Sequence, residues 1–193
     1  MTWSGCTWIT AHVIVLCVDE TSQIQALERT QPPCPVAPGR RPDRRTHDYR
    51  RHGTTTRFAA LEVTTGQLTD VCHPQHRRSE FLEFLKLVAK AYPRRQLQVV
   101  LDNYATHKHA KVQAWLGNHP RVRLHFTPTY ALWLNLIEVF CSTLERQALR
   151  RGDFGTVEEL VAAIGRFGDG WNHRCQPFRW TKDADQVLVQ RNR

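Results

Sequence analysis

The chain has 193 residues, of which 41% are hydrophobic, and its formal net charge is +9. This length favours one domain with a core of its own, and no apolar run approaches the ~20 residues of a membrane span. The start of the chain lacks the basic region of a signal peptide, and the six cysteines contain no CxxC pair, so neither a zinc ribbon nor a redox dithiol is indicated. Nucleic acid is the leading candidate partner for the positive charge, although a generally basic surface explains that charge equally well.

The first element of the chain is a continuous apolar run. Residues 1–11 show no period and form an atypical N-terminal segment. Val13–Val18 follows and ends on Asp19-Glu20, which indicates a buried strand that delivers a carboxylate at its end. The period of residues 21–30 is ambiguous between strand and helix.

Proline and arginine dominate residues 31–53, which predicts a loop. A run of charges is usually only a solvated surface. Here arginine supplies the positive charge and a tyrosine lies among the arginines, a pattern that suits phosphate contacts and stacking on bases. Loops of this length are also often functional. The candidate DNA-binding residues are Arg40, Arg41, Arg44, Arg45, Tyr49, Arg50 and Arg51.

Two strands and a helix are expected next. Arg57–Val63 and Gln67–Val71 have the composition of strands, and the turn between them, 64–66, predicts a hairpin. Arg78–Tyr92 has the clearest helical period in the chain, and Pro93 stops it.

A second apolar run that ends in a carboxylate follows. Leu97–Leu101 predicts a strand that ends on Asp102, and a helix is expected over 107–118. Val122–Phe126 alternates as another strand, and an apolar helix then carries Glu138. The 35 residues between Asp102 and Glu138 suffice for a strand–helix–strand unit that returns the second carboxylate to the first.

The last elements are helical. The helix that carries Glu138 is expected to continue to Leu149. Thr156–Phe167 predicts another helix, with Thr156 as its N-cap and Glu159 three residues later in a capping-box pattern. Residues 176–193 form a polar C-terminal tail.

Three carboxylates are the candidate chemical centre. If the strands that end on Asp19 and Asp102 are parallel neighbours, the two aspartates lie side by side, and Glu138 reaches them from a packed helix. Three close carboxylates need a counter-charge, which two Mg²⁺ ions supply. Two such ions ~4 Å apart activate a water or a 3′-hydroxyl and stabilise the leaving oxygen of a phosphodiester. On spacing alone, a purely structural role, with strand-end turns and a salt bridge, remains an equal alternative.

Three further residues are candidates to support these carboxylates. Asn103 follows Asp102 directly and can hold a carboxylate or a water. His107 can position a phosphate or a carboxylate, or only cap a helix. Asn135 precedes Glu138 by three positions, which predicts that both lie on one helix face.

Four ordered blocks resemble transposases of the IS630 group, within the Tc1/mariner superfamily. They read VDETSQIQALERTQP, RRTHDYRRHGTTTRFAAL, LDNYATHKHAKVQAWL and HPRVRLHFTPTYALWLNLIE. The resemblance implies an α/β, RNase H-like fold over residues 12–175, with a mixed central sheet flanked by helices. It also implies that Asp19, Asp102 and Glu138 form a DDE catalytic triad that binds Mg²⁺ or Mn²⁺, two ions in all.

The same resemblance implies a function on DNA. Members of the group cut double-stranded DNA at transposon ends and join it to a target, so the expected partners are DNA and either a second copy of the chain or an intact transposase. A cytoplasmic, nucleoid-associated bacterial protein is implied.

Family members usually carry a helix-turn-helix region before the first catalytic aspartate, but only 18 residues precede Asp19 here, so the sequence predicts a truncated copy. Two alternatives remain open: another RNase H-like nuclease, and a non-catalytic remnant that binds DNA. A further candidate, Cys72-His73-x-x-His76, lacks the second pair that a zinc site needs.

Overall fold

The structure is a computed structural model of the chain and describes residues 13–30, 48–127, 135–150 and 152–177. The predicted N-terminal segment, most of the basic loop and nearly all of the C-terminal tail lie outside the described residues. In the described part, no helix is long and apolar enough to cross a membrane.

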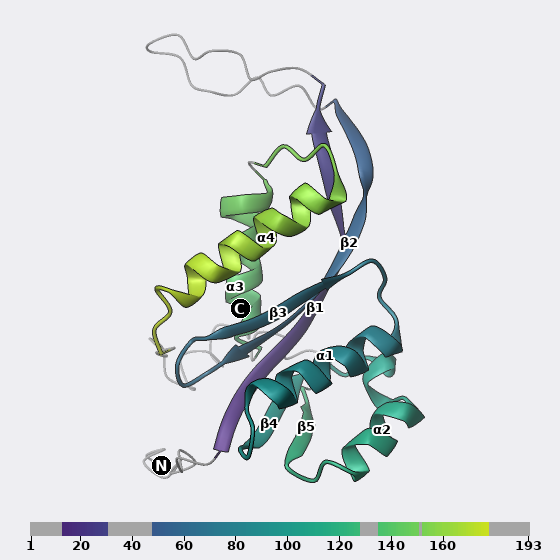
Figure 1. Cartoon of the computed structure of the whole chain (residues 1–193), viewed down its shortest axis with the longest axis vertical. Helices are drawn as coiled ribbons and strands as arrows, with labels where there is room; N and C mark the ends of the chain where they lie inside the picture. The colour runs from purple at the N-terminus through teal and green to yellow at the C-terminus, as the bar shows by residue number, and fades with distance from the viewer. Residues whose placement is uncertain (1–12, 31–47, 128–134, 151, 178–193) are drawn as a thin grey trace, which may run out of the picture.

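Five strands form one mixed sheet with the order β3-β2-β1-β4-β5 (Figure 1). β2 is antiparallel to both of its neighbours, β1 and β3, whereas β4 is parallel to its neighbours β1 and β5. The strands are β1 (Val13–Arg29), β2 (Tyr49–Glu62), β3 (Leu68–His73), β4 (Gln96–Leu101) and β5 (Val122–Phe126).

β1 is longer than the sequence predicted. The strand does not end with the apolar run at Asp19-Glu20, because residues 21–29 continue it by pairing with 49–57 of β2. Two register shifts interrupt this pairing, after Thr21 and after Gln25, as β-bulges do. Figure 1 shows the resulting two-stranded ribbon extending beyond the rest of the sheet. The predicted loop over 31–53 is therefore wrong for 49–53, which belong to β2.

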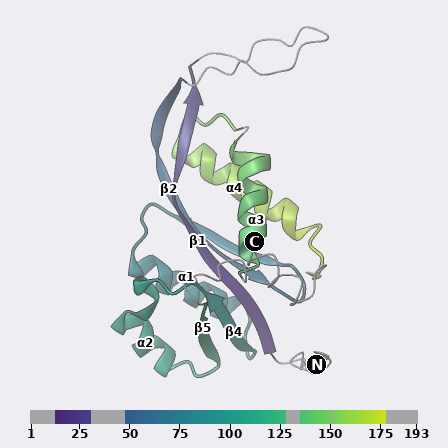
Figure 2. The same cartoon turned by 180° about the vertical axis from the view of Figure 1, so that it is seen from behind.

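Helices cover both faces of the sheet (Figures 1 and 2). One face carries α1 and α2, and the other carries α3 and α4, as the two separate apolar clusters show. The helices are α1 (Arg78–Ala91), the 3₁₀ helix η1 (Ala105–Lys108), α2 (Ala110–Gly117), α3 (Ile137–Leu144), the π-helical turn η3 (Glu145–Leu149) and α4 (Val157–Asn172).

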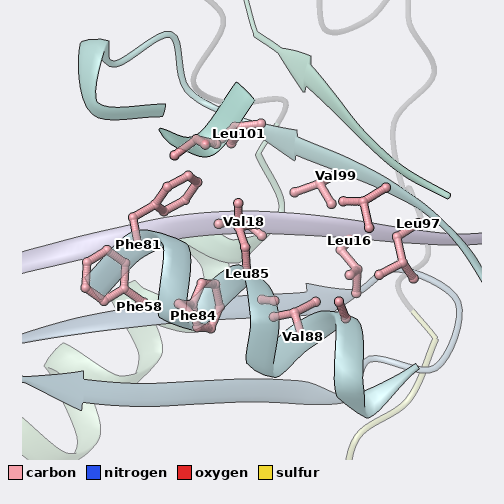
Figure 3. Close-up of a cluster of buried hydrophobic side chains, with 14 residues drawn as sticks. Leu16, Val18, Phe58, Phe81, Phe84, Leu85, Val88, Leu97, Val99 and Leu101 are labelled. Carbon is pink, nitrogen blue, oxygen red and sulfur yellow. The ribbon is translucent and has the colours of Figure 1, made fainter. Parts of the chain in front are cut away.

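The packing of α1 on the sheet explains why neighbouring residues of β1 face opposite ways. Leu16 and Val18 point toward α1 and meet its fully buried Phe81 and Phe84 (Figure 3). Cys17, between them, packs in the cluster under α3 and α4. This alternation places consecutive side chains on opposite faces of the strand.

Most of the predicted elements are confirmed. α1, β3, β4 and β5 lie within a few residues of their expected bounds, and the predicted hairpin is present, although its first strand, β2, begins at Tyr49 rather than at Arg57. Thr156 caps α4 through its hydroxyl, which accepts from the Glu159 amide at 3.1 Å, although α4 runs on to Asn172.

The helix expected over 107–118 is wrong at its start. His107 belongs to η1, and α2 begins only at Ala110. The break is at His109, which is extended and whose side chain caps α2 by accepting from the Lys111 amide. A local cap of this kind stops a helix from extending backwards.

Candidate active site

The sheet brings the two predicted aspartates together. Asp19 lies within β1, opposite Ala59 of β2, and Asp102 follows the last residue of β4. The parallel pairing of β1 with β4 aligns Cys17 with Val100. Two residues further along each strand, this register sets Asp19 beside Asp102. Asp19 is thus in the middle of a strand and not at its end as the sequence predicted.

Glu138 is the second residue of α3, on the same face of the sheet as Asp19. The buried Asn135 sets its position, because the Asn135 amide donates to the carbonyl oxygen of Val18 at 2.8 Å. The carbonyl oxygen of Asn135 in turn accepts from the Glu138 amide at 3.1 Å. Asn135 therefore lies just before α3, not on a helix face as predicted, and joins the start of that helix to the residue before Asp19.

The charges of the three carboxylates act on one another. Burial, the largest cause, and the nearby charges of Asp102 and Glu138 raise the pKa of Asp19 to about 6, against the opposing effect of the Glu20 amide. An ionised Asp19 is thus disfavoured, because burial and its acidic neighbours oppose its charge and no salt bridge in the described part includes it.

The donor set suits a hard divalent cation, since Mg²⁺ and Mn²⁺ prefer carboxylate oxygens. Within the described residues, no three acidic, histidine or cysteine side chains are already arranged to enclose a metal ion. The suitability of these carboxylates for a divalent cation therefore rests on the chemistry of the donor atoms and on the excess negative charge around Asp19.

His107 contacts Asp102 from the opposite face of the sheet. Its ring is almost fully buried, at 3% exposure, and packs 4.3 Å from the ring of Phe81. Its Nδ1 lies 3.2 Å from both the carbonyl oxygen and Oδ1 of Asp102. The predicted supporting residue Asn103 is exposed in the turn after Asp102.

Glu20 is a neighbouring carboxylate that sequence reasoning did not select. Its Oε1 lies 2.6 Å from Nε2 of His76, and its Oε2 lies 3.7 Å from Nε2 of His107. Burial acts to raise the pKa of Glu20, but the two histidines outweigh it and hold that pKa below its usual value. The signal available in the sequence was the Asp19-Glu20 pair itself. Adjacent residues of a strand face opposite sides of the sheet, so one of the two acids must face α1.

Arg57 is a second residue that the sequence did not single out. It is fully buried in β2, and its guanidinium lies 4.6 Å from the ring centroid of Phe140 in α3. Nη2 donates to Sγ of Cys141 at 3.5 Å, and Nε lies 3.9 Å from Asp70. An arginine directly before the apolar run Phe58–Leu61 was the signal in the sequence for this buried contact with α3.

Of the predicted DNA-binding residues, only Tyr49, Arg50 and Arg51 lie in the described part. They are exposed at the start of β2, opposite the end of β1. Arg40, Arg41, Arg44 and Arg45 lie outside it.

A mixed sheet of this order, flanked by helices, defines an α/β domain that carries carboxylates on β1, after β4 and on α3. The family described as DDE superfamily endonuclease matches residues 14–161. The chain belongs to this family of endonucleases, and its resemblance to the IS630 and Tc1/mariner group is confirmed.

The chain is similar to one curated protein, an uncharacterised 39 kDa protein of insertion element IS630 from Shigella sonnei. The two are 27% identical over 109 residues, which is 56% of this chain and 32% of that protein. The chain thus spans about a third of the length of this relative.

Solved structures of Mos1 share the fold. A Mos1 transposase paired-end complex with the left transposon end has a TM-score of 0.58 at 14% identity, covering 92% of this chain and 50% of that one. The Mos1 strand transfer complex gives 0.57 at 15% identity, with coverages of 89% and 48%. A Mos1 mariner paired-end complex with Mn gives 0.57 at 15% identity, with coverages of 90% and 49%. The predicted RNase H-like fold is confirmed.

Proposed function

We propose that this chain is the catalytic domain of a DDE transposase, which cuts DNA strands at transposon ends and joins them to target DNA. The observation that carries the proposal is that Asp102 and Glu138 lie close enough to Asp19 for their charges to act on it, in a domain of the DDE endonuclease family. The Mos1 relatives, whose structures contain transposon-end or strand-transfer complexes, support the assignment.

In this proposal the three carboxylates hold two Mg²⁺ or Mn²⁺ ions. Bound there, the ions supply Lewis acidity for phosphodiester cleavage and strand transfer. The role of the protein is to fix the geometry of the ligands. Asp19 sits in the central strand, Asp102 at the end of the parallel neighbour, and Glu138 in the first turn of α3. Such rigid elements keep the ligands within the ~0.5 Å that a catalytic geometry tolerates.

The supporting residues hold these ligands in place. His107 positions Asp102 through its Nδ1 contacts, and Glu20 faces the other ring nitrogen of His107. Asn135 ties the start of α3 to β1, and so fixes Glu138 relative to Asp19. Asn103 is exposed beside Asp102, where it can hold a carboxylate or a water.

Double-stranded DNA is the proposed substrate and partner. The arginines at 40, 41, 44, 45, 50 and 51, with Tyr49, are proposed to contact its phosphates and bases. Replacing the six arginines with alanine should flatten the salt dependence of duplex binding, because phosphate contacts release counterions. A second copy of the chain or an intact transposase completes the assembly, and such a protein would act at the nucleoid.

One assay tests the proposed function directly. A pre-cut transposon-end duplex is incubated with the chain and Mg²⁺ or Mn²⁺, with and without an intact partner transposase, and joining to a target plasmid is measured. The proposal predicts strand transfer that depends on the metal. A chain that binds the duplex but stays inert under all of these conditions is a DNA-binding remnant. Cleavage of RNA–DNA hybrids without any strand transfer would instead assign another RNase H-like nuclease.

A further inference from the structure

A basic groove lies between the starts of α1 and α2, on the face of the sheet opposite α3. Its volume is about 910 Å³, and the described residues that line it are His76, Arg77, Arg78, Ser79, Leu82, His109 and Lys111. Three of these residues carry a permanent positive charge, two more are histidines, and none of them is acidic.

Within the part of the chain that the structure describes, the cations of this groove form no salt bridge. Among the described residues, no salt bridge includes Arg77, Arg78 or Lys111, and all three side chains are exposed. The acid nearest to them along α1 is Glu80, which accepts a hydrogen bond from Ser79 at 2.6 Å. The first turn of α1 also lacks a side-chain cap. Unpaired cations and free amides in a groove are complementary to phosphate groups.

The groove adjoins the candidate active site. His76, in its wall, lies 2.6 Å from Glu20, the residue after Asp19. His109, in the same wall, follows His107, which contacts Asp102, by two residues. The described candidates for DNA contact, Tyr49, Arg50 and Arg51, instead lie at the start of β2, at the far end of the β1–β2 ribbon (Figures 1 and 2).

We infer that this groove binds the phosphodiester backbone of duplex DNA next to the carboxylates, as a contact surface separate from the arginines at 40–51. The inference rests on the proposed function, because it takes DNA as the partner. Arg77, Arg78 and Lys111 contact successive phosphates there and hold the duplex against the edge of the sheet where Asp102 lies.

Two matched triple variants of the full chain test this inference. Arg77→Ala/Arg78→Ala/Lys111→Ala removes three charges from the groove. Lys86→Ala/Lys90→Ala/Arg95→Ala removes three charges from exposed positions in and after the second half of α1. The affinity for a duplex is measured as a function of salt, and circular dichroism checks that both variants fold.

The groove variant should lose up to about 2.7 units of the slope of log K against log[salt], because each phosphate contact contributes about 0.9. The control variant should lose less than about one unit. Equal losses in the two variants would show that only net charge matters and would overturn the inference, as would an unchanged slope in the groove variant.

A competition arm separates DNA from a small anion as the occupant. Inorganic phosphate replaces chloride at constant ionic strength, and it should displace the duplex equally from the wild-type chain and the control. Phosphate that binds the wild-type chain but not the groove variant, while the two have the same duplex affinity and salt slope, would assign a small-anion site and overturn the inference. The binding readout is independent of cleavage, so a wild-type chain that is inert with Mn²⁺ would defeat the proposed function while leaving the slope result to decide the groove.

Discussion

Asp19 and Glu20 are adjacent acids of one strand, but they lie in opposite electrostatic surroundings. Asp19 faces α3, where its burial and, to a smaller extent, the acids Asp102 and Glu138 raise its pKa to about 6. Glu20 faces α1, where His76 and His107 hold its pKa below the usual value. Glu20 has two histidine partners within the protein, whereas Asp19 forms no salt bridge in the described part.

This difference indicates which side of the strand carries the chemistry. A buried acid with a partner contributes to stability at neutral pH, whereas a buried acid among other acids lowers stability. Folds retain such an unfavourable arrangement mainly at functional sites. In the proposed function, the face of Asp19 is therefore the one that binds the cation, and Glu20 supports it from the opposite face.

The largest expected effect is the loss of catalysis when the acid cluster is broken. Asp19→Ala, Asp102→Ala and Glu138→Ala should each lower DNA nicking at least ~10³-fold, because the ligands act as one unit. Duplex affinity, measured by gel shift, should stay within about twofold, because the phosphate contacts lie on other residues. Glu138→Asp should fail as well, since a side chain shorter by one methylene withdraws its oxygens from the site.

Glu145→Ala is the matched control for these substitutions. It removes an exposed carboxylate from the π-helical turn that follows α3, and it should keep near wild-type nicking. Nicking that survives Asp102→Ala would rule out the triad.

The second effect is on stability, and it has opposite signs at the two acids. A folded-state pKa raised from 3.8 to about 6 means that Asp19 destabilises the fold as the pH rises from about 4 to above 6. In metal-free buffer, Asp19→Asn should therefore be more stable than the wild-type chain at pH 7.5, by at most about 3 kcal/mol. The gain should vanish near pH 4, where the wild-type carboxyl is protonated. Urea unfolding at both values of pH measures this, and equal stability at pH 7.5 would refute the assigned environment.

A smaller effect is expected at Glu20. Its lowered pKa means that its ionised form stabilises the fold above the pKa of the unfolded state, and that this stability is lost as the pH falls through the lower folded-state pKa. Glu20→Gln should lower the free energy of unfolding at pH 7.5 by about 1–2 kcal/mol, because it weakens the contacts with His76 and His107. The same urea experiment measures this change in stability. A Glu20→Gln variant that is more stable than the wild-type chain would contradict the stabilising contacts of Glu20 with His76 and His107.

The sequence predicted Asp19 as a candidate site residue, but it did not predict the contacts that Glu20 makes with His76 and His107. Apolar runs that end in acids identified Asp19 and Asp102, since such runs are local signals that survive in the fold. The contacts of Glu20 depend on His76, which is distant in sequence and reaches β1 only because α1 packs on the sheet. No local pattern contains that information.

The difference between local signals and contacts distant in sequence also explains which elements of the fold were predicted correctly. α1 was predicted almost to the residue, because a periodic apolar face encodes it locally. The second half of β1 had no clear period, and it is a strand because β2 pairs with it from across a long connection. The start of α2 was missed because the cap at His109, rather than the apolar period, decides where that helix begins.

The most direct test of the central claim is Mn²⁺-dependent stabilisation of the wild-type chain and of matched variants at pH 7.5. A ligand at 100 times its dissociation constant stabilises a fold by about 2.7 kcal/mol. Saturating Mn²⁺ should therefore raise the melting temperature of the wild-type chain and of Glu20→Gln, but not that of Asp19→Asn, Asp102→Asn or Glu138→Gln. An equal rise in all five proteins, or no rise in the wild-type chain, would contradict the account that the three acids share a metal site.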